Sequence, residues 1–379
     1  MKALPKLLTP ITLRSVTARN RLVVSPMCQY SAGLGMANDW HFAHLSRFAL
    51  GGFGTVIVEA TAVTPEGRIT HGDLGLWNDD QMVPLAHIAA FLKARGAVPA
   101  IQIGHAGRKA SAQRPWEGDA AMTAQDLSER AEAPWKVYAP SSIPHNDGWI
   151  VPEVLDQAGI DRIREAFVAT ARRANTAGFD ILEVHCAHGY LMNEFLSPIA
   201  NTRTDSYGGS LENRMRFPLE TFEAVRAVWP QDKPLFVRIS AIDGVDGGWS
   251  LDDSVAFAKA AAKLGVDVID TSSGGVGRSY KGPFGPMHQV PFAQAIRERA
   301  GIKTMAVGLI TKPEEAASIV DHGQADLVAL GREALANPQW PLHAQAALTD
   351  DPLDYRSWPI QAGFWLRGRA AALARLKRG

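Results

Sequence analysis

Eight short apolar segments recur along the chain, each rich in Val, Ile, Leu and Ala and bounded by Gly, Pro or Asn. Runs of this kind are typical of buried β-strands. The predicted strands are Asn20–Met27, Thr55–Val63, Ala97–His105, Phe179–Ala187, Pro234–Ser240, Val266–Ser273, Ile302–Ile310 and Ala325–Glu333.

Between the strands, apolar residues at helical spacing predict helices. These include Asp161–Ala177, Ser254–Leu264, Pro291–Arg299, Pro313–Val320 and Leu335–Leu348. A glycine follows several of them, as a left-handed C-cap requires: Gly178, Gly265, Gly301 and Gly323. Repeated strand-then-helix units predict parallel strands covered by helices, and a count of eight favours a closed (β/α)8 (TIM) barrel. We therefore expect an α/β fold with one domain over residues 1–379.

One long stretch, residues 106–156, follows the third strand without clear periodicity and contains several prolines. Long excursions of this kind are usually functional, so we expect a lid over the barrel mouth. The GGFG at Gly51–Gly54 precedes a strand, which indicates a helix C-cap and not a dinucleotide fingerprint.

Composition narrows the function class. Lys and Arg number 39 and so do Asp and Glu, so there is no basic footprint for nucleic acid. The N-terminal stretch is too polar for a signal peptide, and no apolar run is long enough for a membrane span. We expect a cytoplasmic protein acting on small molecules. Two cysteines, Cys28 and Cys186, are too few for a disulfide framework or an iron–sulfur cluster.

The active site of such a barrel lies at the carboxyl ends of its strands. Gly308, Gly331 and Arg332 stand at the ends of the last two strands, where backbone N–H groups and a guanidinium can bind a phosphate. The alternative is that these glycines only turn the chain. A bound phosphate would indicate a phosphate-bearing cofactor.

The cluster of His185, His188 and Tyr190 at the end of the fourth strand admits three interpretations. The imidazoles can polarise a substrate oxygen while Tyr190 donates a proton. The two histidines can bind zinc with Cys186, although Cys186 alternates with His185 along the strand and should point away. Finally, all can be ordinary polar residues at a barrel rim.

Arg238 lies within an apolar strand and needs an anionic partner, because an unpaired buried charge costs several kcal/mol. That partner is either the edge of a flavin that gains negative charge on reduction or a strand carboxylate such as Glu59. Cys28, at a strand end, is either a reactive thiol or inert packing.

Taken together, the motifs of the chain resemble those of the old yellow enzyme family, in its xenobiotic-reductase and thermophilic-like branch, along nearly the whole length. The motifs are RNR at Arg19–Arg21, PMCQY at Pro26–Tyr30, NDWH at Asn38–His41, EATAV with PEGRI in Glu59–Ile69, IQIGHAGRKA at Ile101–Ala110, RPWEG at Arg114–Gly118, HCAHGYL at His185–Leu191, NTRTDSYGGSLENR at Asn201–Arg214 and GRE at Gly331–Glu333.

The resemblance implies an FMN-dependent ene-reductase with these site residues. The isoalloxazine would be surrounded by Ser25, Pro26, Met27, Cys28, Ala60, Gln102, His185 and Arg238, and the phosphate held by Gly308, Gly331 and Arg332. Substrate would meet Tyr30, Ile69, His185, His188 and Trp365. Tyr190 would be the proton donor, Cys28 would tune the flavin potential, and no metal is expected.

The implied reaction has two halves: NADPH or NADH reduces tightly bound FMN, and the alkene of an enone, enal, maleimide or nitroalkene then takes hydride from flavin N5 and a proton. The resemblance also implies a homo-oligomer, a dimer or a dimer of dimers, whose C-terminal tail, residues 350–379, completes the neighbour's site through Trp365. Where close relatives carry a seventh-strand tryptophan this chain has Val307, which predicts a roomier cavity. A metal-dependent hydrolase on the same barrel and a non-enzymatic flavin-binding protein are the alternatives.

Overall fold

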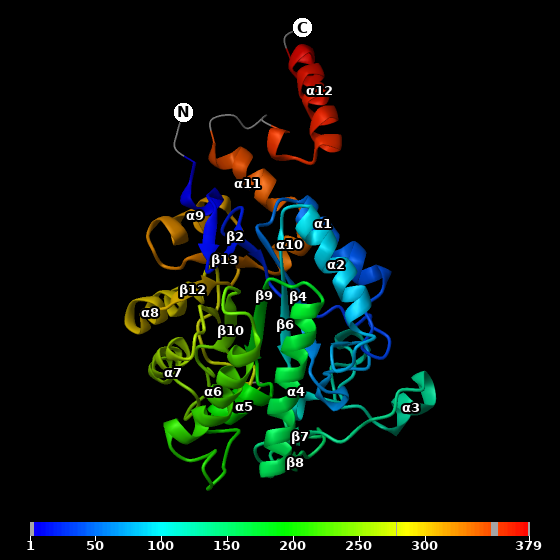
Figure 1. Cartoon of the computed structure of the whole chain (residues 1–379), viewed down its shortest axis with the longest axis vertical. Coiled ribbons are helices and arrows are strands. Elements are labelled where there is room, and N and C mark those ends of the chain that lie inside the picture. Colours follow the sequence, from blue (N-terminus) through cyan, green and yellow to red (C-terminus); the bar gives the residue numbers. More distant parts are fainter. Residues whose placement is uncertain (1–3, 278, 350–354, 378–379) are drawn as a thin grey trace.

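Eight parallel strands close into a barrel at the centre of the molecule (Figure 1). They are β3 (Leu22–Val24), β4 (Thr55–Ala62), β6 (Val98–Gly104), β9 (Ile181–Cys186), β10 (Leu235–Ser240), β11 (Val268–Ser272), β12 (Lys303–Ala306) and β13 (Leu327–Leu330). Strand β3 pairs with both β13 and β4, which closes the ring. This computed structural model describes residues 4–277, 279–349 and 355–377 and confirms the predicted TIM barrel.

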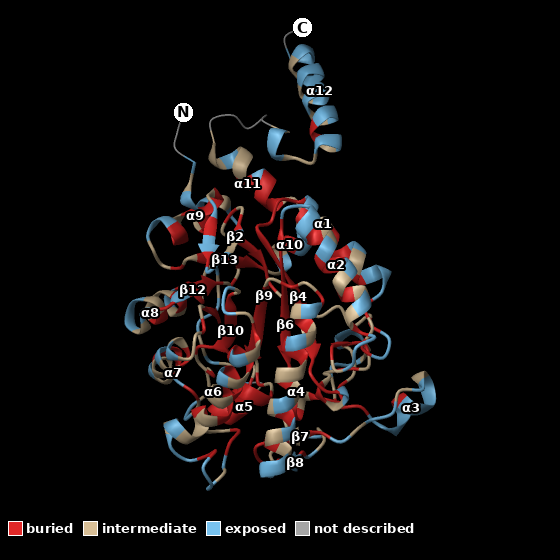
Figure 2. Cartoon of the chain, in the orientation of Figure 1, coloured by how far each residue is buried: buried red, intermediate tan, exposed pale blue. Residues whose placement is uncertain are grey.

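Helices surround this barrel (Figures 1 and 2). They are α1 (Asp39–Leu50), α2 (Met82–Ala94), α4 (Gln157–Thr176), α6 (Leu211–Val228), α7 (Leu251–Lys263), α8 (Val290–Ala300), α9 (Pro313–Asp321), α10 (Arg332–Ala336) and α11 (Trp340–Leu348). The prediction of one helix over Leu335–Leu348 is wrong, because α10 ends at Ala336 and α11 begins at Trp340. Pro338 lies in the break, and Pro341 is tolerated in the first turn of α11.

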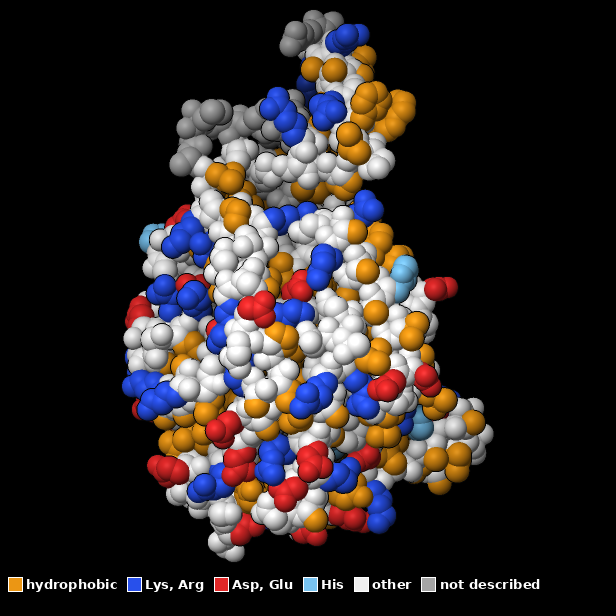
Figure 3. Space-filling model, in the orientation of Figure 1, with side chains coloured by type: hydrophobic (Ala, Val, Ile, Leu, Met, Phe, Trp, Pro, Cys, Tyr) orange, Lys and Arg blue, Asp and Glu red, His pale blue; other side chains and the backbone are white. Residues whose placement is uncertain are grey.

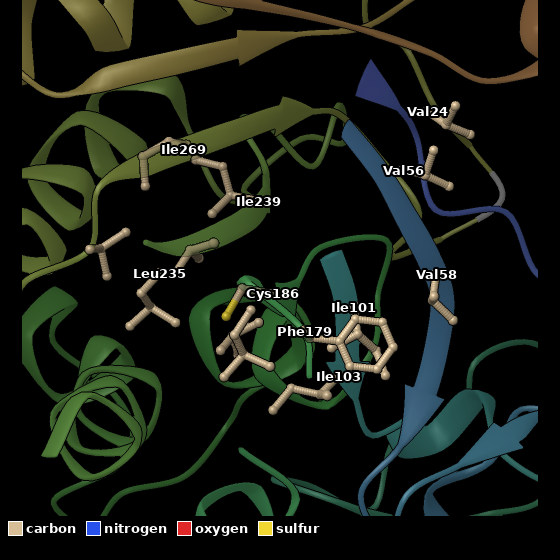
Figure 4. Close-up of a cluster of buried hydrophobic side chains, with 14 of the residues drawn as sticks. Val24, Val56, Val58, Ile101, Ile103, Phe179, Cys186, Leu235, Ile239 and Ile269 are labelled. Carbon is tan, nitrogen blue, oxygen red and sulfur yellow. The ribbon is translucent and has the colours of Figure 1, made fainter. Parts of the chain in front are cut away.

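Side chains on the outer faces of the strands form the main hydrophobic core with the helices (Figure 4). Val56, Ile101, Cys186, Ile239 and Ile269 belong to it, and each is at most 1% exposed. Cys186 thus points outward while its neighbour His185 points into the barrel, as strand alternation predicts. The thiol of Cys186 contacts the sulfur of Met192 at 3.1 Å.

The barrel interior has an apolar floor, the cluster formed by the following inward-facing residues: Val23, Ile57, Ala100, Ile181, Phe236, Val268, Met305 and Leu327. A hairpin of β1 (Ile11–Leu13) and β2 (Val16–Ala18) packs against this floor and closes that end of the barrel. Two residues further along each strand, the inward positions are Ser25, Glu59, Gln102, Glu183, Arg238, Asp270, Val307 and Ala329. The interior therefore changes from apolar to mostly polar within two residues.

The excursion over residues 106–156 contains α3 (Ala124–Arg130) and the short strands β7 (Tyr138–Ala139) and β8 (Glu153–Val154). Strands β7 and β8 lie beneath the end of α4, whereas α3 extends away from the barrel (Figure 1). The expected lid over the mouth stays a prediction.

The chain ends in α12 (Ile360–Leu376), which stands at the end of the molecule opposite β7 and β8 (Figure 1). Among its described residues only Gly363 is buried. Residues 350–354 and 378–379 of the predicted C-terminal tail lie outside the described residues. None of the described helices has both the length and the apolar character needed to cross a membrane.

Candidate active site

A cavity of about 400 Å³ opens at the carboxyl ends of β3, β10, β11, β12 and β13. Its lining includes seven of the predicted cofactor residues: Ser25, Pro26, Met27, Arg238, Gly308, Gly331 and Arg332. Val307 also lines it. The structure therefore brings the two predicted phosphate-binding strand ends together with the first strand end and the buried arginine.

Gly308 shows that this cavity needs glycine at one strand end. Its φ of 118° is a conformation that side-chain-bearing residues rarely adopt, and a Cβ there would lie 2.9 Å from Oε1 of Gln289. Gly331, by contrast, has an ordinary contact of 3.7 Å to the sulfur of Met27. Two arginines and two strand-end glycines around one cavity are suited to a phosphate-bearing group such as FMN.

Arg238 crosses the barrel interior from β10. Its Nη1 donates a 2.8 Å hydrogen bond to Oγ of Ser25, and its Nε lies 3.2 Å from Oδ2 of Asp270 on β11. The carboxylate partner is therefore Asp270 and not Glu59, because β10 and β11 pair with Arg238 opposite Asp270. Arg238 also lines the large cavity, so the ion pair leaves the guanidinium in contact with the cofactor region.

A second, much smaller cavity of about 10 Å³ adjoins the histidine cluster. Its lining includes Ala60, Ile69, His185 and Tyr190, all predicted site residues, together with His105 and Asp73. Tyr190 stands one residue before α5 (Leu191–Leu196), at the carboxyl end of β9. The rings of His185 and Tyr190 meet nearly edge to face, with centroids 5.0 Å apart.

The rings of His185 and His188 lie edge to face, with their centroids 5.2 Å apart. His188 has a φ of 62°, in the left-handed region, and its Nε2 lies 2.7 Å from Oγ of Ser272. His185 Nδ1 accepts a hydrogen bond from the backbone N–H of Ala187, which places the proton of the neutral ring on Nε2. The predicted proximity of the two imidazoles is confirmed.

The electrostatic surroundings keep these groups uncharged at neutral pH. Burial, followed by the nearby charge of Arg238, lowers the pKa of His185 and of His188 well below the usual value. Burial raises the pKa of Tyr190 well above 10. The site therefore offers neutral N–H donors beside a protonated phenol.

Lys109 packs beneath this cluster from the loop after β6. Its ammonium donates a 2.9 Å hydrogen bond to the backbone oxygen of His188 and lies 5.1 Å from the centre of the Tyr190 ring. Burial lowers the Lys109 pKa to about 8. Lys109 thereby joins the excursion to the turn that carries His188 and Tyr190.

Cys28 and Tyr30 lie in the loop that follows β3, and both are half-buried. Burial raises the pKa of the Cys28 thiol well above its usual value, so the group is a neutral thiol. Tyr30 has a φ of 50°, and its ring meets that of Trp116 edge to face at 5.8 Å. The backbone oxygen of Tyr30 accepts a 3.2 Å hydrogen bond from Arg114. Residues of the excursion therefore hold Tyr30 in place.

Five predicted residues line neither cavity: Cys28, Tyr30 and His188, described above, and Gln102 and Trp365. Gln102 is buried inside the barrel, where its Nε2 donates a 2.9 Å hydrogen bond to Oε1 of Glu183. Trp365 is 75% exposed on α12 and touches no part of the site of its own chain. The sequence interpretation missed Glu183 and Asp270, although an acidic residue inside an apolar strand is a usable signal.

Gln289 and His288 were also missed. Both line the large cavity from the segment before α8, and Gln289 Nε2 donates to Oγ of Ser273 at 2.9 Å. No motif marks them, because they lie in the irregular segment between β11 and α8, where the ring of Tyr280 lies close to Gly274 and Gly282.

Comparison with known proteins identifies the family. Residues 6–351 match the NADH:flavin oxidoreductase / NADH oxidase family. An NADPH dehydrogenase of Geobacillus thermodenitrificans (strain NG80-2) is 45% identical over 358 residues, 93% of this chain and 98% of that protein. The chain belongs to this family of old yellow enzymes. It is therefore an oxidoreductase that uses FMN, with NAD(P)H as the hydride donor.

Solved structures agree with the fold. Morphinone reductase superposes with a TM-score of 0.74 at 25% identity and covers 94% of this chain and 93% of its own. A 2-naphthoyl-CoA reductase has a TM-score of 0.81 at 23% identity, and this chain spans 53% of its length. Within the described residues, no group of three or more His, Cys, Asp or Glu side chains is placed to hold a metal ion.

Proposed function

We propose that this protein reduces the activated C=C bonds of enones, enals, maleimides and nitroalkenes. The observation that carries the proposal is the pair of neutral imidazoles, His185 and His188, set edge to face beside the protonated phenol of Tyr190. Neutral donors beside a proton source suit a substrate whose oxygen gains negative charge while its carbon gains a proton.

The histidines bind the carbonyl or nitro oxygen of the substrate. His185 presents Nε2–H, because its Nδ1 accepts from the backbone of Ala187. His188 is oriented by Ser272 and by Lys109, which binds its backbone oxygen. Because these donors are held in place before substrate arrives, they stabilise the developing charge without rearrangement.

Tyr190 donates the proton to the α-carbon of the alkene. Its raised pKa keeps the proton on the phenol at neutral pH, and its ring lies over the Lys109 ammonium, which favours the transient loss of that proton. Tyr30 reaches the same substrate oxygen from the β3 end, and Ile69 contributes an apolar wall.

The large cavity holds the cofactor. Gly308, Gly331 and Arg332 bind the phosphate, while Ser25, Pro26, Met27, Cys28, Ala60, Gln102 and Arg238 surround the ring. Bound FMN supplies hydride transfer between NAD(P)H and the alkene. Arg238 balances negative charge at the ring edge, and the neutral thiol of Cys28 tunes the reduction potential.

The decisive experiment separates the two halves of the reaction. Anaerobic NADPH should bleach the flavin absorption of the purified protein, and cyclohexenone should restore it. Tyr190→Phe should leave bleaching at the wild-type rate and slow reoxidation. A reduced protein that no enone, maleimide or nitroalkene reoxidises would refute the proposal.

The protein also forms a homo-oligomer in this proposal, with α12 as the contact. Phe364 and Trp365 are 60% and 75% exposed on a helix whose described residues bury only Gly363, and Figure 3 shows apolar side chains gathered on it. Large aromatics beside arginines are characteristic of interface anchors. Trp365 then completes the site of a neighbouring subunit.

Truncation after Asp354 tests this contact, with Leu373→Ala as a control on the same helix. The truncated protein should form smaller species in light scattering and lose apparent affinity for enones while it retains FMN. An intact oligomer with unchanged affinity would disprove the shared site.

A further inference from the structure

Four polar side chains form a buried layer between the apolar floor and the two cavities. Gln102, Glu183, Arg238 and Asp270 come from the neighbouring strands β6, β9, β10 and β11, and each is at most 7% exposed. We call these four residues the polar layer. None of them contacts solvent to an extent that would compensate a buried charge.

The contacts of the polar layer leave its carboxyl groups incompletely satisfied. Oε1 of Glu183 accepts from Gln102, and Oδ2 of Asp270 lies 3.2 Å from Nε of Arg238, an ion pair without hydrogen-bond geometry. Oε2 of Glu183 and Oδ1 of Asp270 have no hydrogen-bond partner among the described residues.

The layer also carries unequal numbers of acidic and basic groups. Two carboxyl groups face one guanidinium, and the imidazoles of His185 and His188 next to Arg238 are neutral. The charge of Lys109 lies on the far side of those rings, where its ammonium donates to the backbone oxygen of His188. Glu59 on β4, which accepts from the backbone of Gln29, would add only negative charge if it ionised. Two ionised carboxylates would therefore leave one buried charge uncompensated, at a cost of several kcal/mol.

The titration behaviour agrees with this count. Burial, and next the Asp270 carboxyl, raise the pKa of Glu183 well above the usual value. Burial likewise raises the pKa of Asp270, while Arg238 opposes the change. Two buried acids beside one cation, one of which raises the proton affinity of the other, behave as a pair with one proton.

We propose that Glu183 and Asp270 share a single proton and act as positioning residues, holding Gln102 and Arg238 against the flavin in a polar layer of zero net charge. The inference rests on the proposed placement of Gln102 and Arg238 at the ring. A neutral layer leaves the charge of Arg238 balanced by one carboxylate, which makes the proton on the second carboxyl a determinant of the flavin potential.

Single amide variants distinguish this arrangement from two ionised carboxylates. Glu183→Gln and Asp270→Asn each remove the shared proton and leave one carboxylate with Arg238, so the net charge stays zero. The midpoint potential of bound FMN should therefore change by less than ~30 mV, which corresponds to a tenfold change in the reduction equilibrium of a two-electron couple. If both carboxylates are ionised, each variant removes a negative charge and raises the potential by more than tenfold.

The double variant Glu183→Gln/Asp270→Asn sharpens the test, because it leaves Arg238 without a carboxylate. Its potential should rise by more than tenfold relative to both single variants. Glu223→Gln, a change of one exposed carboxylate on α6, is the charge-matched control and should leave the potential unchanged.

Infrared spectroscopy gives an independent readout that does not require the flavin. At pH 7 the protonated-carboxyl C=O absorption of the wild-type protein should lose one component in Glu183→Gln and in Asp270→Asn, with or without FMN, while the component of a separate buried carboxyl such as Glu59 remains. If either variant keeps this component, the shared proton is refuted. Either variant alone decides the question, so failure of one to fold leaves the test intact.

The two proposals can fail separately. A wild-type protein that holds FMN but reduces no alkene would end the proposed function, while loss of the carboxyl component in the two amide variants would still establish the shared proton. A protein that reduces enones but whose amide variants keep the full carboxyl absorption would retain its function and lose the inference.

Discussion

The floor and the polar layer of the barrel come from the same strands but contribute differently to the protein. Phe236 and Arg238, two residues apart on β10, represent them: one packs among apolar side chains from every strand, and the other contacts Ser25, Asp270 and the large cavity. The floor stabilises the barrel through burial of apolar area. The polar layer costs free energy unless its groups are paired, and that cost is acceptable where chemistry requires charge.

The sharpest challenge to this comparison is a change in the floor. Phe236→Ala should reduce the free energy of unfolding by about 3–5 kcal/mol, because it leaves a cavity among fully buried neighbours. Denaturant unfolding measures this loss. The folded fraction should still bind FMN. A variant with wild-type stability would show that the floor does not stabilise the barrel.

A change above the polar layer should instead affect the reaction rate and leave the folded protein and its cofactor in place. His185→Ala with His188→Ala should leave FMN bound and reducible but slow enone reduction by roughly a hundredfold or more, as the loss of oxyanion donors does. Stopped-flow mixing of the reduced variant with cyclohexenone measures this rate. A wild-type rate would remove the histidines from substrate binding.

Glu59, a buried carboxyl at the same level of the barrel as the polar layer, should also make stability depend on pH. Burial raises the pKa of Glu59 to about 8, so the folded protein binds a proton there that the unfolded chain releases near 4.5. Stability from this group is complete below pH 4.5 and is lost as pH rises towards 8. Glu59→Gln should reduce the decrease in unfolding free energy between pH 5 and 8 by about 1 kcal/mol or more. Identical pH profiles for variant and wild type would contradict the raised pKa.

The smallest effect is expected at Cys28. Cys28→Ala should shift the FMN midpoint potential and change both half-reactions by less than about tenfold, since a neutral thiol near the ring is not a nucleophile. Redox titration and stopped-flow kinetics measure the two effects. Complete loss of turnover with FMN still bound would indicate covalent catalysis instead.

Local pattern alone was sufficient for much of this protein. Strand alternation correctly separated His185 from Cys186, and the glycines after helices take the left-handed conformation, as Gly178 and Gly301 show with φ of 90° and 70°. The order of strand and helix implied the barrel, and the strand ends located the site. These features depend on neighbours in the chain, which the sequence contains directly.

Tertiary structure decided what depends on pairing between distant segments. The register of β10 against β11 places Asp270 and not Glu59 beside Arg238, and no local pattern contains that register. The turn around Pro338 divides a predicted helix, and the Pro338 carbonyl lies so close to Gly51, far away in the sequence, that a Cβ there would collide with it. The sequence by itself therefore determined the fold and most of the residues at the mouth, whereas the partners of the buried charges emerged only when eight strands closed around one interior.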